Sequence, residues 1–348
     1  MSDKIELLSM GLDEIRLWLK SHGFESYRAK QLIGWLVSGA KFSEMRNLPS
    51  NLIEFLCENA LEEPVKIIKS LVSKKDGTEK YLFSLADGSC VEGVLMPYRH
   101  GNTLCISTQV GCNMGCKFCA STLGGKLRNL SAGEMLGQVV SVNRLHGSKT
   151  VQNVVMMGSG EPLDNYGNVL KFIRLICAGE GLNISQRRIT LSTCGLVDKI
   201  KSLADEGLSI TLSISLHAPN DAIRQSLMPI AKVHSVKDII NACKHYISLT
   251  HRRVSFEYAL IKGVNDSQEQ AEELCQILRG FQCHVNLITL NAVEETGYLG
   301  SDRITANKFF DYLNERNIAV SMRRTMGEDI QGACGQLRNE FIKGGGQN

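Results

Sequence analysis

Residues 111–119 read GCNMGCKFC and bring three cysteines, Cys112, Cys116 and Cys119, into one short run. Thiolates are soft ligands that suit zinc or iron–sulfur clusters. A closed zinc site needs four ligands, and a disulfide framework needs an even number of cysteines. A [4Fe–4S] cluster on three thiolates would leave one iron open to a substrate or cofactor. The alternative is a zinc ion that a distant cysteine such as Cys105 completes.

This run follows the first of six β-rich stretches that alternate with helical patterns from about residue 100 onward. The stretches are TLCISTQVG (103–111), VQNVVMMG (151–158), RRITLST (187–193), SITLSISLHA (209–218), RRVSFEYALI (252–261) and HVNLITLN (284–291). Between them, segments such as EMLGQVVSVNRL carry apolar residues at helical spacing. Strands that alternate with helices predict a parallel sheet. We therefore expect an α/β fold with six β/α units, a partial barrel with its functional loops at the carboxyl ends of the strands.

The chain ahead of the barrel divides into two regions. Residues 1–62 predict a helical domain, with helices in GLDEIRLWLKSHG, YRAKQLIGWLVSG and LPSNLIEFLCENAL, where Trp18 and Trp35 belong to the core. Residues 63–100 predict a small β-rich connecting region with turns at KKDGTEK and LADGS. The barrel with its C-terminal cysteine segment then occupies 101–340, and 341–348 form a flexible tail.

Composition and charge indicate a folded protein with reduced thiols. The 348 residues are 43% hydrophobic, and the net charge of +3 is too small to indicate a nucleic-acid partner by itself. The first residues carry acids where a signal peptide would be basic, and no stretch approaches the roughly 18 apolar residues of a membrane span. Twelve cysteines in such a chain favour a reducing compartment. We expect a soluble cytoplasmic protein without membrane contact.

The cysteine run resembles the cluster motif of the radical S-adenosylmethionine (radical SAM) superfamily, C-x3-C-x-aromatic-C, with Phe118 in the aromatic position. The resemblance implies a [4Fe–4S] cluster on Cys112, Cys116 and Cys119. It also implies that the amino and carboxylate groups of S-adenosylmethionine cap the open iron. Electron transfer then cleaves the sulfonium and yields a 5′-deoxyadenosyl radical.

Small and polar residues end the later strands, where this cofactor would lie. By spacing alone each is more often a helix cap than a ligand. Glu161 could pair with the cofactor's ammonium group. The resemblance assigns the following residues to the cofactor site: Gly160, Glu161, Ser192, Ser215, Leu216, His217 and Asn291.

A longer series of motifs is more specific than the cluster motif. TLCISTQVGC, CASTLGGKLRNLS, MGSGEPL, STCG, SISLHAPN, GVND, HVNLI and ACGQL occur in this order. Together they resemble the RlmN and Cfr family of RNA methyltransferases, from the YRAKQ helix near residue 28 to about residue 338. Pro162 favours the RlmN type, whereas Ser159 stands where the family often has Met.

The family resemblance implies roles for two further cysteines and one acid. Cys334, in DIQGACGQLR, would be methylated by one S-adenosylmethionine. A radical from a second molecule would then convert that methyl group into a methylene radical, which adds to adenine. Cys105 would attack the sulfur of Cys334 and release the base as a disulfide forms. Glu92 would remove the ring proton, although by sequence alone it resembles a solvent-facing acid in an edge strand.

Without the resemblance, both cysteines would be assigned to the buried small residues, as we expect for Cys57, Cys177, Cys243 and Cys275. The radical route also has a chemical reason. The target carbon of adenine is electron-poor and has no lone pair with which to attack a sulfonium.

The implied substrates are C2 of an adenine in 23S rRNA, at the peptidyl transferase centre, and an adenine in tRNA. Each turnover would use two S-adenosylmethionine molecules and an electron donor such as flavodoxin or ferredoxin, and the enzyme would be a monomer. The close alternative is Cfr-type methylation of C8, which gives resistance to ribosome-targeting antibiotics. A more distant alternative is a non-catalytic iron–sulfur or zinc protein that binds RNA.

RNA binding requires cations for the phosphates and a means of capturing an unstacked base. The candidates are Tyr27, Arg28, Lys30, Lys126, Arg128, Arg323 and Arg324. Each could equally be a solvated surface residue.

Overall fold

A single ten-stranded sheet, in the order β1-β2-β3-β4-β7-β8-β9-β10-β11-β12, organises the part of the chain that the structure describes. The computed structural model describes residues 4–147, 149–291, 296–330 and 332. Its parallel strands are β4 (Thr103–Cys105), β7 (Asn153–Met156), β8 (Ile189–Thr193), β9 (Thr211–Ser215), β10 (Val254–Leu260), β11 (Cys283–Thr289) and β12 (Val320–Met322). All six expected strands are present, and β12 is an addition that was not expected.

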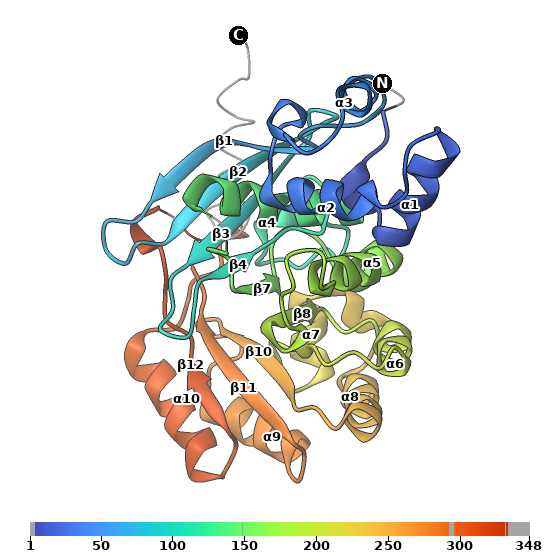
Figure 1. The fold of residues 1–348 in the computed structure, drawn as a ribbon. Helices are drawn as coiled ribbons and strands as arrows, with labels where there is room; N and C mark the ends of the chain where they lie inside the picture. Colours follow the sequence, from blue (N-terminus) through green and yellow to red (C-terminus); the bar gives the residue numbers. More distant parts are fainter. Residues whose placement is uncertain (1–3, 148, 292–295, 331, 333–348) are drawn as a thin grey trace.

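Helices of the β/α units cover the outer face of this sheet (Figure 1). They are α4 (Ala132–His146), α5 (Tyr166–Cys177), α6 (Val197–Asp205), α8 (Val236–Thr250), α9 (Gln268–Leu278) and α10 (Arg303–Glu315). The short helix α7 (Asp221–Leu227) lies instead beside the cysteine run, since the Lys117 amide donates to the Leu227 carbonyl. Several begin at a side-chain cap. The Ser131 hydroxyl accepts a hydrogen bond from the Glu134 amide at 2.9 Å, and Asp302 caps α10 through the Thr305 amide at 2.8 Å.

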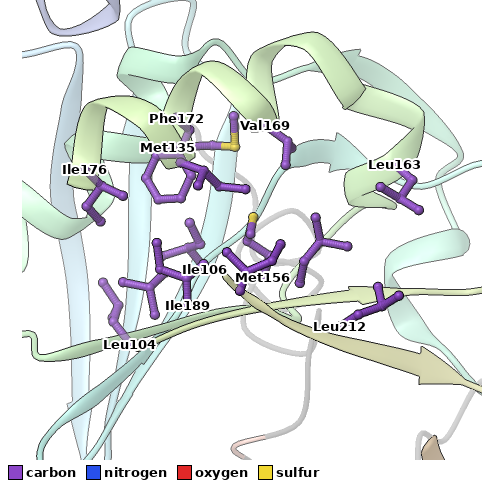
Figure 2. Close-up of a cluster of buried hydrophobic side chains, with 14 of the residues drawn as sticks. Leu104, Ile106, Met135, Met156, Leu163, Val169, Phe172, Ile176, Ile189 and Leu212 are labelled. Carbon is purple, nitrogen blue, oxygen red and sulfur yellow. The ribbon is translucent and has the colours of Figure 1, made fainter. Parts of the chain in front are cut away.

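The main core lies between the sheet and these helices. Figure 2 shows Leu104, Met156 and Ile189 of the strands packed beneath Met135 of α4 and Phe172 of α5, all fully buried. Successive residues of a strand point to opposite faces. The residues between these apolar ones therefore face the concave side of the sheet.

Three antiparallel strands extend the sheet ahead of β4. They are β1 (Val65–Val72), β2 (Glu79–Leu85) and β3 (Cys90–Met96), and β3 pairs with β4 so that Val94 lies opposite Cys105. The two expected turns lie between β1 and β2 and between β2 and β3. The sheet curves enough for Met96 of β3 and Arg324, which follows β12, to line one cavity.

The N-terminal helices lie next to α4 and α5, with α2 in contact with α4 (Figure 1). They are α1 (Leu12–Ser21), α2 (Arg28–Ser38) and α3 (Ser50–Asn59), as expected, and Trp18 and Trp35 are partly buried against the core. A salt bridge of 2.7 Å from Lys171 of α5 to Glu14 of α1 joins the N-terminal helices to the β/α units.

Among the described residues, no helix is both long and apolar enough to span a bilayer. No described cysteine forms a disulfide. The expectation that Cys57 is buried is wrong, because its side chain is exposed on α3, whereas Cys243 and Cys275 are buried as expected and Cys177 is intermediate. Cys334 and the expected tail at 341–348 lie outside the described residues.

Candidate active site

The cysteine run forms a loop that a small hairpin holds at its base. Strands β5 (Gln109–Gly111) and β6 (Lys126–Asn129) flank it, and the Cys112 amide donates to the Gly125 carbonyl at 3.1 Å. Gly111 has φ +77°, and a Cβ there would lie 1.9 Å from the Gly125 oxygen. Only glycine therefore permits this closure. On its other side the Lys117 amide donates to the Leu227 carbonyl at 2.9 Å.

The three thiols of this loop fit a multi-iron cluster. Burial, opposed by a hydrogen bond from the Met114 amide and reinforced by the neighbouring Cys119, raises the pKa of Cys112 to about 11. Burial, then Cys119 and Cys112, also raises the pKa of Cys116. As thiolates, these three side chains would repel one another, and bound iron would neutralise their negative charge.

Among the described residues, no three His, Cys, Asp or Glu side chains converge as closely as one metal ion requires. A cluster places each thiolate on a different iron, so its ligands stand further apart than those of a single ion. Cys105 does not join the loop, because it packs with Val94 and Met96 on the concave face.

Glu161 connects the loops that follow β7 and β8. Its carboxylate accepts hydrogen bonds from the Leu163 amide at 3.0 Å and the Cys194 amide at 2.7 Å. Burial raises the pKa of this carboxyl, and these hydrogen bonds oppose the rise. Gly160 has φ +109°, and a Cβ there would lie 2.7 Å from the Gln109 side chain, so this position also requires glycine.

The residues that end β8 and β9 meet on the concave side. The hydroxyls of Ser192 and Ser215 lie 3.5 Å apart. Leu216 is fully buried, its amide donates to the Glu257 carbonyl at 3.1 Å, and its carbonyl accepts from Arg224 at 3.2 Å.

His217 has a left-handed backbone, with φ 55°, and its Nδ1 accepts a hydrogen bond from the Ala259 amide at 2.9 Å. Burial, and secondarily Arg224, lowers the pKa of His217 to about 3. The ring is therefore neutral near pH 7, with its proton on Nε2, where it can donate. The Phe118 ring packs edge-on against it at 5.0 Å.

One cavity of about 250 Å³ brings several expected residues together. Cys105, Cys119, His217, Asn291, Arg323 and Arg324 all line it, as does Gly332. The cavity therefore joins the cysteine loop, β4 and the chain after β12. The remaining candidates do not line it: Glu92, Cys112, Cys116, Gly160, Glu161, Ser192, Ser215 and Leu216.

Glu92 is neither solvent-facing nor in an edge strand, so that alternative is wrong. It lies in β3, between β2 and β4, and is 6% exposed. Its Oε1 lies 3.9 Å from Nζ of Lys80, which is also buried. The hydroxyl of Ser107, two residues after Cys105, donates to the Glu92 carbonyl at 2.7 Å.

The cation candidates for RNA fall into two groups. Arg128 donates hydrogen bonds to both oxygens of Glu134 at 2.7 Å and one to Asp87. The bonds to Glu134, and to a smaller extent the bond to Asp87, raise the pKa of Arg128. Lys126 pairs with Asp164 at 2.6 Å. Both cations are thus already balanced by protein carboxylates.

The other RNA candidates lie on α2 and along the cavity. Tyr27 and Lys30 are exposed at α2, and the Arg28 guanidinium lies 4.7 Å from the centre of the Tyr27 ring. Arg323 and Arg324 line the cavity, as described above.

Two buried residues near the site were missed by sequence reasoning. Asn265, in GVND, donates to the carbonyls of His217 and Ala259, each at 2.7 Å. The motif was the only signal for it. Arg224 is fully buried and contacts the loops after β8 and β9, and nothing in the helical pattern around it distinguished it from a surface arginine.

This loop of three cysteines at the end of a parallel sheet defines a radical SAM enzyme, and the model of the radical SAM superfamily matches residues 106–275. The chain is 52% identical over 341 residues to a Clostridium botulinum protein named "Probable dual-specificity RNA methyltransferase RlmN", with 97% of each chain covered. It is 49% identical over 344 residues to the Clostridium tetani protein of the same name, covering 99% of this chain and 98% of the other.

A solved radical SAM methyltransferase from Sphaerobacter thermophilus superposes with a TM-score of 0.92 at 41% identity, covering 95% of this chain and 98% of the other. The chain therefore belongs to the RlmN family of dual-specificity RNA methyltransferases. Members of this family use a [4Fe–4S] cluster and two S-adenosylmethionine molecules per turnover, as the motifs implied.

Proposed function

We propose that this chain methylates C2 of an adenine in 23S rRNA and in tRNA, using Cys334 as methyl carrier and Cys105 as the releasing thiol. One observation carries the proposal: Cys105, Cys119 and Gly332 line the same cavity. Gly332 precedes Cys334 by two residues, which span at most about 7 Å. The proposal requires the thiol of Cys334, which lies outside the described residues, to reach Cys105 and the cysteine loop.

When bound by Cys112, Cys116 and Cys119, the cluster and S-adenosylmethionine supply a 5′-deoxyadenosyl radical. The sulfur of Cys334 would hold the methyl carbon that is transferred. The Cys105 thiolate would attack this sulfur, so that an S–S bond forms as the carbon–sulfur bond to the base breaks, and the released methylene carbon would keep the electron pair and take up a proton to become the methyl group. The resulting disulfide must be reduced before the next turnover.

Glu92 would act as the base, although its side chain does not line the cavity. It lies on the same face of β3 as Val94, which pairs with Cys105 across the sheet. Its carboxylate would take the ring proton of the adenine, and the buried Lys80 would orient it.

The RNA would reach the cavity past exposed cations. Arg323 and Arg324, which line the cavity, would hold phosphates next to the target base, and Tyr27 and Lys30 of α2 would contact RNA further away. Flavodoxin or ferredoxin would supply electrons to a monomeric enzyme.

Two cysteine variants test the roles. In anaerobic turnover with an rRNA fragment, Cys105→Ala should accumulate a covalent protein–RNA adduct, seen as a shifted band on a denaturing gel. Cys334→Ala should form neither adduct nor product. Cys57→Ala, which changes an exposed cysteine of α3, should behave as wild type. Absence of the adduct from Cys105→Ala would contradict the releasing role, and a C8-methylated product would contradict the C2 assignment.

A further inference from the structure

Arg224 of α7 is the largest fully buried side chain in the described part of the chain. Its guanidinium makes no ion pair with any described carboxylate. It donates instead to four backbone carbonyls: Cys194 at 2.5 Å, Leu216 at 3.2 Å, Ser215 at 3.3 Å and His234 at 3.5 Å.

A buried cation without a counter-ion is costly, because carbonyl dipoles replace only part of its hydration. Burial lowers the pKa of Arg224, while the nearby Cys194 and Cys116, and to a smaller extent Asp221 at the start of α7, oppose that shift. Arginine nevertheless stays protonated in proteins. The molecule therefore holds a fixed positive charge beside the cysteine loop, and its natural counter-charge is the negative charge of a thiolate-bound cluster.

The carbonyls that Arg224 binds belong to the loops that carry the candidate cofactor contacts. Ser215 and Leu216 are themselves such candidates. The peptide of Cys194 is held from both sides, because its amide donates to Glu161 and its carbonyl accepts from Arg224. One planar guanidinium thus fixes the loops after β8 and β9 relative to each other.

Gly195 allows the first of these loops to close over the guanidinium. It has φ +99°, and a Cβ there would lie 2.7 Å from Ile239 and 3.5 Å from Nη2 of Arg224. A side chain at this position would push the loop away from both neighbours.

We propose that Arg224 is a positioning residue that fixes the two S-adenosylmethionine loops and, through its charge, favours the reduced form of the cluster. The inference rests on the proposed placement of the cluster on Cys112, Cys116 and Cys119. Reduction adds a negative charge to the cluster, and a nearby fixed cation stabilises that charge. Both roles are independent of contact with RNA.

Two variants separate charge from shape. Arg224→Met removes both, and Arg224→Lys keeps the charge but cannot reach carbonyls of four residues with one ammonium group. Arg16→Met, an exposed change on α1, is the control. The full-length proteins are reconstituted anaerobically and assayed for iron and sulfide. The cluster potential is then measured by EPR-monitored titration, and S-adenosylmethionine affinity is measured by calorimetry.

Arg224→Met should load iron but show a more negative potential and about tenfold weaker S-adenosylmethionine binding, as expected for lost charge-assisted hydrogen bonds. Arg224→Lys should keep a potential near wild type with the same loss of affinity. An unchanged potential in Arg224→Met, or wild-type affinity in Arg224→Lys, would overturn the inference.

If Arg224→Met does not fold, the lysine variant still decides, because a shifted potential or an unchanged affinity contradicts the proposal. Failure of the proposed cluster site itself would look different. In that case the wild type would take up no cluster, or Cys112→Ala would take up a full one.

Discussion

Replacement of Asn265 by alanine should be one of the more damaging single changes in this chain. Its side chain is fully buried and makes three hydrogen bonds of 2.7 Å, to the carbonyls of His217 and Ala259 and from the amide of Ile261. Each contributes about 1 kcal/mol net, and a buried group left without a partner costs more. We therefore expect the free energy of unfolding to fall by about 3–5 kcal/mol. Since Asn265 holds the His217 carbonyl, S-adenosylmethionine affinity should fall too.

The assay is urea unfolding of the apo-protein followed by far-UV circular dichroism. Ser131→Ala is the control, because it removes the hydrogen bond that caps α4 and a side-chain hydrogen bond with Glu6, and it should cost about 1 kcal/mol. Asn265→Asp should be as damaging as Asn265→Ala at neutral pH, because it replaces the amide group that donates to two carbonyls with a carboxylate oxygen that can only accept. If Asn265→Ala costs no more than Ser131→Ala, the three buried hydrogen bonds do not support the site as described.

Three further changes test the site and its supports. Gly160→Ala, whose Cβ would lie 2.7 Å from Gln109 at φ +109°, should weaken S-adenosylmethionine binding at least tenfold by calorimetry, with helical content unchanged. Burial lowers the pKa of His217 to about 3, so the neutral ring stabilises the fold above about pH 6.5. That stability should be lost as the pH falls from about 6.5 toward 3. In urea titrations, His217→Asn should make the free energy of unfolding depend less on pH over this range. Burial favours a raised pKa for Asp76, but hydrogen bonds, chiefly from the Gly327 amide, outweigh burial and lower the pKa to about 2. The hydrogen bond from Gly327 to Asp76 should therefore persist above about pH 4 and weaken toward pH 2. At neutral pH, Asp76→Ala should speed tryptic cleavage near residue 324.

Periodic elements could be predicted from the sequence, whereas pairings between distant segments could not. The six expected parallel strands and the N-terminal helices followed from alternating and helical hydrophobic patterns. Strand β12 (Val320–Met322) was missed, because its few apolar residues follow α10 directly and Arg323 and Arg324 end the pattern, whereas the equally short β4 lies within the longer β-rich stretch 103–111. That β3 joins the parallel sheet through β4 depends on contacts that no local pattern encodes.

The candidate site shows the same division. Motifs indicated the cysteine loop and the cofactor residues, and the structure adds how buried polar groups hold them. Glu92 looked like an exposed acid, because its burial depends on the pairing of β3 with β2 and β4, which the local sequence does not reveal. Arg128 looked like an RNA contact, but it is bound by Asp87 and Glu134. Arg224 gave no signal, since a buried arginine and a surface arginine look alike on an amphipathic helix.

The most direct test of the central proposal follows the methyl hydrogens. The reconstituted enzyme is given a reductant, an rRNA fragment and S-adenosylmethionine with a fully deuterated methyl group, and the RNA nucleosides are analysed by mass spectrometry against C2 and C8 standards. Transfer through a methylene on Cys334 predicts 2-methyladenosine that keeps two of the three deuterons. A product that retains all three would show direct polar transfer and would contradict the account.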